Sequence, residues 1–298
     1  MDSAVPDIAG MTREVAVRAP EIAVSVVDAS SLIKTDGSTH WRRTLADSAL
    51  GNLFEKLAPT HVYLGSEFCE HLIPASRSLL NALGVATELN CRLSLLTPIS
   101  APADLRTLGK LLPHLPDESE VIVSDWGTAY FIREHFPNLT LVAGRILCRM
   151  GKDPRIPAAY SALSAPFDAR PMKAMLARLG FVRMEVDVPI FDSRRALSSL
   201  PLPGSVHVPF ACVAKGRMCR IGSTAMRGVE RFAVGRRCRK ECLRVSARLA
   251  RPHADDQRQV FQLGNSIVSR VTDEMLTAVL DAVNSGSVSR LVVPGDPI

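Results

Sequence analysis

The chain has 298 residues, of which 47% are hydrophobic, so it can bury a large core and is not an intrinsically disordered protein. Its formal net charge is +6, but Lys215–Arg251 alone holds 12 cations and 2 anions, so the basic character is local. No apolar run reaches the roughly 18 residues that a membrane-spanning helix needs. Seven cysteines and no secretory signal predict a cytoplasmic protein whose thiols are free, catalytic or bound to metal.

The pattern along the chain predicts a flexible N-terminal tail at residues 1–20 and one barrel-like domain at residues 21–298 that carries the cysteine site. Short apolar, β-branched runs predict strands at 21–29, 60–68, 87–97, 120–126, 139–148, 181–191, 205–215, 260–269 and 289–295. Apolar residues at a spacing of three and four predict helices at 45–58, 75–84, 102–115, 127–136, 171–180 and 272–283.

This alternation is typical of parallel β-α units. Because eight or so strands are predicted and no GxGxxG motif is present, we expect an α/β fold of the TIM-like β/α barrel type, complete or incomplete, rather than an open dinucleotide-binding sheet. Residues 216–251 interrupt the alternation, so this Arg- and Cys-rich stretch is predicted to be an insertion before the last strands.

Four polar residues near predicted strand ends are weak candidates for catalysis, because such barrels place their chemistry at the C-terminal ends of the strands. Asp125 could position a substrate, although a helix N-cap is the plainer interpretation. Arg145 could bind a carboxylate or take part in a structural ion pair. Glu185 shares a strand face with Asp187 and could do acid–base work if that face is the barrel interior. His207 is expected to be a structural histidine.

The stretch RRCRKECLR, Arg236 to Arg244, places two cysteines among five cations. If it is helical, Cys238 and Cys242 project from one face, with Cβ atoms about 5–6 Å apart. Cys219 precedes them, and Cys69 follows the second predicted strand. Four thiolates can bind zinc or an iron–sulfur cluster, and the absence of any CxxC pair favours the cluster.

Cations close to these thiols would stabilise both thiolates and a negatively charged cluster. The nearest in sequence are Arg217, Arg237, Arg239 and Lys240. The other three cysteines lie in apolar strand contexts and are predicted to be inert core thiols. They are Cys91, Cys148 and Cys212.

Several short motifs occur in a recognisable order: YLGxxxC, SDWG, VAGRILC, EVDVP, and VPFACVAKGRMCRIGS followed by CRKEC. In this order they resemble the collagenase-like peptidase family U-thirty-two, and within it the UbiV-type proteins of oxygen-independent ubiquinone biosynthesis. The resemblance runs from about Val62 to the C-terminus. It rests on one early and three late cysteines rather than on any single motif.

The resemblance implies a barrel-like fold and a [4Fe–4S] cluster held by Cys69, Cys219, Cys238 and Cys242. It also implies a larger UbiU-type homologue as partner in a heterodimer. The pair would hydroxylate a ubiquinone precursor without molecular oxygen, with a small anion such as prephenate as the suggested oxygen source. The chain departs from the family pattern at Ser66, at Glu70-His71 and at Cys148, so a divergent paralogue is a second interpretation.

Three other functions stay open. The first is an iron–sulfur-dependent RNA-base hydroxylase that binds phosphates through the Arg-rich segment, although an aromatic content of 5% offers few surfaces for base stacking. The second is a non-catalytic subunit that stabilises its partner. Peptidase activity is the least favoured, because the sequence holds neither GxSxG nor HExxH.

Overall fold

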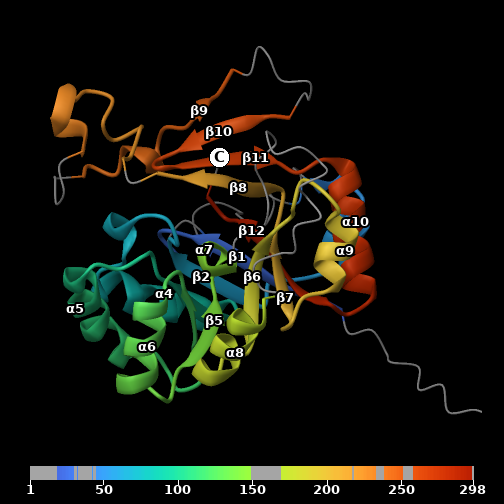
Figure 1. Cartoon of the computed structure of the whole chain (residues 1–298), viewed down its shortest axis with the longest axis horizontal. Coiled ribbons are helices and arrows are strands. Elements are labelled where there is room, and N and C mark those ends of the chain that lie inside the picture. Colours follow the sequence, from blue (N-terminus) through green and yellow to red (C-terminus); the bar gives the residue numbers. More distant parts are fainter. Residues whose placement is uncertain are drawn as a thin grey trace, which may run out of the picture.

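The computed structural model describes residues 19–29, 32, 42, 45–148, 169–216, 218–232, 238–250 and 258–296. Most of the predicted tail, residues 1–18, therefore lies outside the described residues. Within the described part, eight parallel strands form a closed barrel in the order β1-β12-β7-β6-β5-β4-β3-β2 (Figure 1). They are β1 (Glu21–Val26), β2 (His61–Gly65), β3 (Arg92–Leu96), β4 (Glu120–Val123), β5 (Thr140–Ala143), β6 (Arg183–Asp187), β7 (Gly204–His207) and β12 (Val288–Pro294). The predicted β/α barrel is confirmed, and it is closed rather than incomplete.

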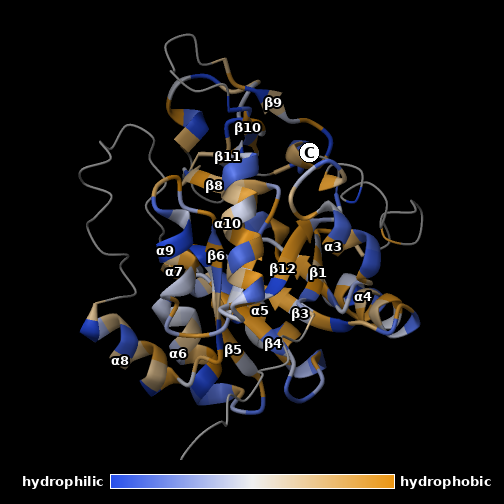
Figure 2. Ribbon diagram, turned by 90° about the vertical axis from the view of Figure 1, so that its right-hand side faces the viewer, coloured by the Kyte–Doolittle hydropathy of each residue, from blue (hydrophilic) through white to orange (hydrophobic). Residues whose placement is uncertain are grey.

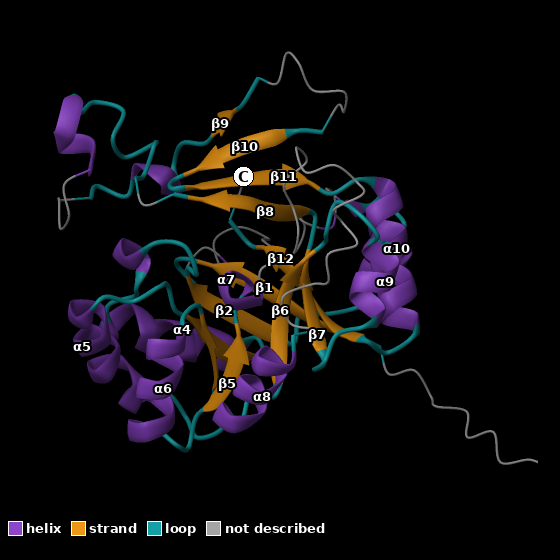
Figure 3. Ribbon diagram, in the orientation of Figure 1, coloured by secondary structure: helices purple, strands orange, loops and turns teal. Residues whose placement is uncertain are grey.

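Helices connect successive strands and cover the outside of the barrel (Figure 3). They are α3 (Gly51–Lys56), α4 (Ser76–Glu88), α5 (Pro102–Leu111), α6 (Trp126–His135), α7 (Arg145–Cys148), α8 (Arg170–Leu179), α9 (Ser193–Ser198) and α10 (Asp273–Asn284). Figure 2 shows the hydrophobic colouring concentrated in the barrel strands. Their outward apolar side chains and the inner faces of the helices form the large core, because burial of this surface is the main driving force for folding.

A second sheet lies beyond the C-terminal ends of the barrel strands, above the barrel in Figure 1. It is antiparallel, in the order β8-β11-β10-β9. Its strands are β8 (Phe210–Lys215), β9 (Ala247–Arg248), β10 (Val260–Leu263) and β11 (Ser266–Arg270). The predicted insertion is therefore larger than 216–251, because two strands predicted near the end of the barrel, β10 and β11, belong to this sheet.

Three predicted strands are shorter than expected. The strand expected at 205–215 leaves the barrel after His207 and resumes as β8 in the second sheet. The strand expected at 260–269 is a hairpin that turns at Gly264, whose φ of +58° suits a residue without a side chain. The strand expected at 139–148 ends at Ala143, and a short helix, α7, follows.

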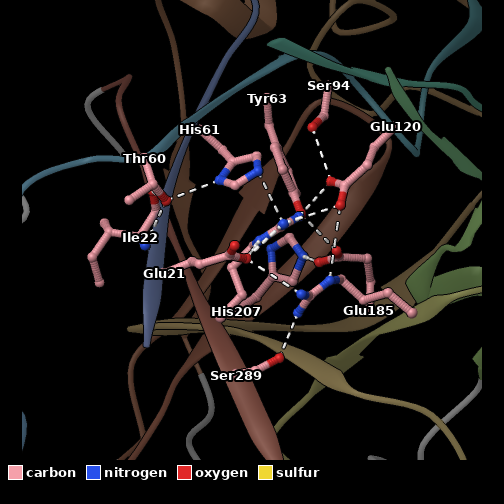
Figure 4. Close-up of polar contacts among 12 residues, drawn as sticks. Glu21, Ile22, Thr60, His61, Tyr63, Ser94, Glu120, Glu185, His207 and Ser289 are labelled. Atoms are coloured by element: carbon pink, nitrogen blue, oxygen red, sulfur yellow. Dashed lines mark hydrogen bonds and ion pairs between the residues drawn. The ribbon is translucent and has the colours of Figure 1, made fainter. Parts of the chain in front are cut away.

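The interior of the barrel near the N-terminal ends of its strands is filled by ions rather than only by apolar side chains (Figure 4). The guanidinium of Arg290, with a side chain only 1% exposed, forms ion pairs with Glu21 and Glu120. It also donates to Tyr63 Oη at 2.7 Å and lies 3.0 Å from His61 Nε2. Two short 3₁₀ helices, η1 (Glu70–Leu72) and η6 (Glu241–Leu243), lie on the loops described next.

Candidate functional site

A cavity of about 410 Å³ lies between the C-terminal end of the barrel and the second sheet. Barrel strands contribute Ser25, Gly65, Leu96, His207 and Val292, and the second sheet contributes Phe210, Leu263, Ser266 and Val268. This is the end of the fold where barrel enzymes carry their chemistry. The cavity is therefore the place to look for function.

All four cysteines proposed as ligands line this cavity, although up to 173 residues separate them in sequence, from Cys69 to Cys242. Cys69 lies on the loop after β2, Cys219 on the loop after β8, and Cys238 and Cys242 lie at and before η6. The fold thus brings together three loops from two different sheets. Their role as ligands stays a prediction.

The turn between β10 and β11 is the point where these loops meet. A Cβ atom added at Gly264 would lie 3.5 Å from Cys242 Sγ and 3.9 Å from Cys219 Sγ, so both sulfurs border a space that a side chain would fill. The next residue, Asn265, donates from Nδ2 to the carbonyl oxygen of Phe68 at 2.6 Å. This bond ties the hairpin to the loop that carries Cys69.

Backbone amides point at two of the sulfurs. The N–H of Gly222 donates to Cys219 Sγ at 3.2 Å, and the N–H of Lys240 donates to Cys238 Sγ at 3.4 Å. Hydrogen bonds of this kind favour the thiolate over the thiol. The second bond also explains why the expected helix through Cys238 and Cys242 is wrong: Lys240 takes a φ of +57°, and only η6 follows.

Burial disfavours the charged form of the thiols where no positive charge enters the cavity. It raises the pKa of Cys69 to about 12, with further contributions from Glu70 and from the sulfurs of Cys242 and Cys238. Burial also raises the pKa of Cys242 to about 11, and the neighbouring Cys219 and Cys238 add to the effect. Metal coordination deprotonates thiols, so a metal or cluster here would release protons on binding.

The donor set suits an iron–sulfur cluster better than a single ion. Zinc needs four sulfurs within about 2.3 Å of one centre. Among the described residues, no three His, Cys, Asp or Glu side chains are gathered closely enough to form such a ready-made ion site. A cluster spaces its thiolates further apart. Of the cations expected nearby, Arg239 and Lys240 are exposed, whereas Arg217 and Arg237 lie outside the described residues.

Arg145 is occupied by structural ion pairs. Its Nε donates to Glu67 Oε2 at 2.6 Å, and an Nη donates to Asp187 Oδ1 at 3.2 Å. Burial opposes the charge of Arg145, but these two carboxylates raise its pKa above the ordinary value. Asp187 also accepts from the backbone N–H of Cys212 at 2.8 Å. Arg145 borders the cavity, but its guanidinium is neutralised before any ligand carboxylate arrives.

Asp125 is the N-cap of α6, as the plainer interpretation predicted. One carboxylate oxygen accepts from the backbone N–H of Thr128 at 2.8 Å, and the other accepts from the Thr128 hydroxyl at 2.7 Å. The second oxygen also accepts from the N–H of Ser100 at 3.0 Å. These bonds fix the loops after β3 and β4, and Asp125 does not line the cavity described above.

Glu185 and Asp187 do share the barrel interior, and both are completely buried. Glu185 accepts from the hydroxyl of Tyr63 at 2.8 Å, and its other oxygen lies 2.8 Å from His207 Nε2. An ionised carboxylate only accepts, so Nε2 of His207 carries the hydrogen. His207 lines the cavity, whereas Glu185 lies beneath it.

Of the thiols predicted to be inert, Cys148 and Cys212 are buried, and Cys91 is half-buried outside the cavity. Sequence reasoning missed the structural roles of Gly264 and Asn265. The signal was present, because a Gly-Asn pair between two β-branched runs is typical of a hairpin turn.

No helix among the described residues is both long enough and apolar enough to cross a membrane. No family model and no curated protein matches the chain. Among solved structures, it is similar to dihydropteroate synthase from Xanthomonas albilineans, with 14% identity, 94% of this chain and 89% of that chain covered, and a TM-score of 0.39.

Two further structures are similar. A GH18 chitinase from Cycas revoluta shares 9% identity over 92% of this chain and 94% of that chain, with a TM-score of 0.35. The spore cortex-lytic enzyme SleL from Bacillus megaterium shares 11% identity over 94% of this chain and 71% of that chain, with a TM-score of 0.32. Likenesses at this level carry no argument about activity, so function has to be argued from the cavity itself.

Proposed function

We propose that this chain binds a [4Fe–4S] cluster through Cys69, Cys219, Cys238 and Cys242. We further propose that it acts as a UbiV-type subunit, with a larger UbiU-type partner, in oxygen-independent hydroxylation of a ubiquinone precursor. The observation that carries the proposal is the convergence of four thiols, distant in sequence, on one cavity at the C-terminal end of the barrel.

The chain's own groups support thiolate ligands at this place. Amide N–H groups of Gly222 and Lys240 donate to two of the sulfurs, and Gly264 leaves open the space beside Cys219 and Cys242. A bound cluster supplies one-electron chemistry, and its potential depends on these hydrogen bonds and on burial. The half-buried setting of all four thiols suits a group that must be shielded from bulk water and still be reached by a partner.

Metal analysis of anaerobically purified protein tests the proposal. We expect about four irons and four sulfides per chain, and loss of both in the Cys238→Ser/Cys242→Ser double variant. The matched control is Cys91→Ser, which changes a half-buried thiol outside the cavity and keeps the full iron content. Wild-type protein that contains zinc, or that holds no iron and resists reconstitution, contradicts the proposal.

The pathway role needs its own test. Affinity purification of the tagged chain from anaerobically grown cells is expected to recover a larger homologue of the same family. An anaerobic deletion strain is expected to lose ubiquinone, and the Cys238→Ser/Cys242→Ser variant is not expected to restore it. Normal quinone levels in the deletion strain, with no homologue recovered, contradict the pathway role even if the cluster is present.

A second candidate function, RNA-base hydroxylation, is favoured by one observation. The segments that carry Cys219 and Cys242 also carry exposed cations, namely Arg220, Arg227, Arg231, Arg239, Lys240, Arg244 and Arg248. Such a surface can bind phosphates, and the affinity then falls as salt rises. We expect weak RNA binding that is insensitive to Arg239→Gln/Arg244→Gln. Salt-dependent binding that this double variant weakens would favour the RNA function over the quinone function.

A further inference from the structure

His207 is the last residue of β7, and it brings a ring nitrogen without a protein partner to the cavity. Its side chain is 6% exposed overall and lines the cavity together with the four thiols. Nε2 is engaged by Glu185 at 2.8 Å. Nδ1 has no hydrogen-bond partner among the described residues. A buried nitrogen of this kind is expected to meet a bound ligand or a water molecule.

A chain of hydrogen bonds beneath His207 fixes the ring (Figure 4). Glu185 lies 2.8 Å from the ring and accepts from Tyr63 Oη at 2.8 Å, and Tyr63 in turn accepts from Arg290 at 2.7 Å. All three supporting side chains are almost completely buried. A carboxylate held against one ring nitrogen sets the tautomer and raises the proton affinity of the other nitrogen. Nδ1 is therefore prepared to accept a proton from the cavity.

The lining of the cavity indicates which ligand could supply that proton. Most of the lining side chains are apolar, among them Phe68, Leu96 and Phe210. Apart from His207, the only basic side chain among the described lining residues is Arg145, which is already paired with two carboxylates. An anionic ligand would thus find no available cation. A neutral ligand with an aromatic or apolar body and a weakly acidic hydroxyl fits this lining.

We propose that His207 is the general acid–base residue of the cavity, exchanging a proton at Nδ1 with the hydroxyl of a neutral phenol-like ligand. The ligand O–H bond breaks, the new N–H bond forms at Nδ1, and the pair becomes an imidazolium and a phenolate; the reverse step returns the proton. Glu185 and Tyr63 are positioning residues. The proposal goes beyond the proposed function, because it rests on the cavity and not on the cluster.

Other ionisable groups face the same space, and any titration of the cavity includes them. They are Glu185 and Tyr63 beneath His207, Glu67 and Arg145 in the cavity wall, the acids Asp28 and Asp296, and the four thiols. A variant series is therefore needed to separate His207 from the rest.

The probe is 4-nitrophenol, whose phenolate absorbs visible light, added to the full chain purified without oxygen. Difference spectra recorded across a pH series give the pKa of the bound phenol. In wild-type protein we expect this pKa to lie below that of free 4-nitrophenol, because the imidazolium stabilises the phenolate. In His207→Gln we expect the phenolate-to-phenol ratio to fall by about tenfold at a given pH. Glu185→Gln and Tyr63→Phe should give smaller shifts in the same direction.

His135→Gln is the control, since His135 is an exposed histidine remote from the cavity lining, and it should titrate like wild type. If His207→Gln does not fold, Tyr63→Phe, which removes a single hydroxyl, carries the test. Failure of wild type to bind the probe, or identical titrations in wild type and the variants, overturns the proposal. Iron measured on the same samples reports separately on the cluster: iron-free protein with an intact shift contradicts the proposed function and leaves His207 in its role.

Discussion

The two ends of the barrel interior are both polar, but they treat their polar groups in opposite ways. At the N-terminal end, Arg290 meets two carboxylates, a phenol and an imidazole, and each of these groups is bonded to it. At the C-terminal end, the thiols of Cys69 and Cys242 are half-buried beside one another, and Nδ1 of His207 has no partner among the described residues. One end is complete within the chain, and the other end is not.

The pKa shifts separate the two ends in the same way. Despite burial, Arg290 lowers the pKa of Glu21 and Glu120, so the folded protein favours their charged forms. Burial raises the pKa of Cys69 and Cys242, so the folded protein alone disfavours their charged forms. The difference teaches that the N-terminal end serves stability, while the C-terminal end is arranged for a group that enters from outside. Barrel enzymes in general divide their two ends in this way.

The largest effect is expected from Arg290→Met, which removes the centre of the N-terminal network. It leaves Glu21 and Glu120 buried without their main partner, and breaking a buried pair of this kind costs about 3–5 kcal/mol in the free energy of unfolding. Urea denaturation of the purified variant measures the loss. The control is Arg194→Met at an exposed ion pair with Asp281, where about 0–1 kcal/mol is expected. Similar losses in the two variants would contradict the distinction between the two ends.

A pH-dependent effect is expected from His61 in the same network. Burial and the neighbouring Arg290 lower its pKa from 6.5 to about 4. The unfolded chain therefore binds the proton more readily, so stability is complete above about pH 6.5 and falls as the pH drops toward 4. The expected loss over this window is roughly 2–3 kcal/mol. Denaturation curves measured at several pH values should show it.

The His61→Gln variant is the control for this pH window. Its absolute stability should be lower, because Thr60 Oγ1 and Arg290 both lose the ring, but its stability between pH 6.5 and 4 should vary far less than that of wild type. An unchanged pH profile in His61→Gln would assign the acid sensitivity to other groups, with Glu21 and Glu120 the first to consider.

The barrel itself could be predicted from the sequence, since period-two and period-3.6 patterns report directly on strands and helices that bury one face. The second sheet could not be separated from it, because β10 and β11 have the same β-branched composition as the barrel strands. The Arg290 network was not predicted either. Glu21, His61 and Glu120 each begin a strand, where a polar residue usually faces water, and only closure of the barrel brings them together.

For the site, sequence order identified the four cysteines, but their meeting depends on contacts that no local pattern encodes. The bond from Asn265 to Phe68 spans 197 residues of sequence. The helix expected through Cys238 failed for a local reason, because the amide of Lys240 bonds to the sulfur instead of joining a helix. Residue types thus predicted which thiols matter, and tertiary contacts decided how they are held.

A smaller effect on stability, but a specific effect on metal content, is expected from Gly264→Ala. At a φ of +58° the new side chain costs about 1 kcal/mol, and its Cβ would lie 3.2 Å from that of Cys242. Gly286→Ala is a matched control, because its φ is +79° and nothing lies within 4 Å of the added atom. Both variants should lose similar stability, whereas only Gly264→Ala should bind less iron. Equal iron contents would remove Gly264 from the site.

The smallest effect on stability is expected from Cys238→Ser, and it separates the two kinds of region most sharply. Cys238 is half-buried on a loop, so the metal-free protein should keep its free energy of unfolding within about 0.5 kcal/mol. The iron content should nevertheless fall to a small fraction of wild type, because one of four ligands is lost. Cys148→Ser should do the reverse, since it places a hydroxyl at a completely buried position far from the ligand set. Iron lost in both variants would mean that the metal content follows general stability. Iron lost only in Cys238→Ser would mean that the end of the barrel left incomplete by the chain is completed by the metal.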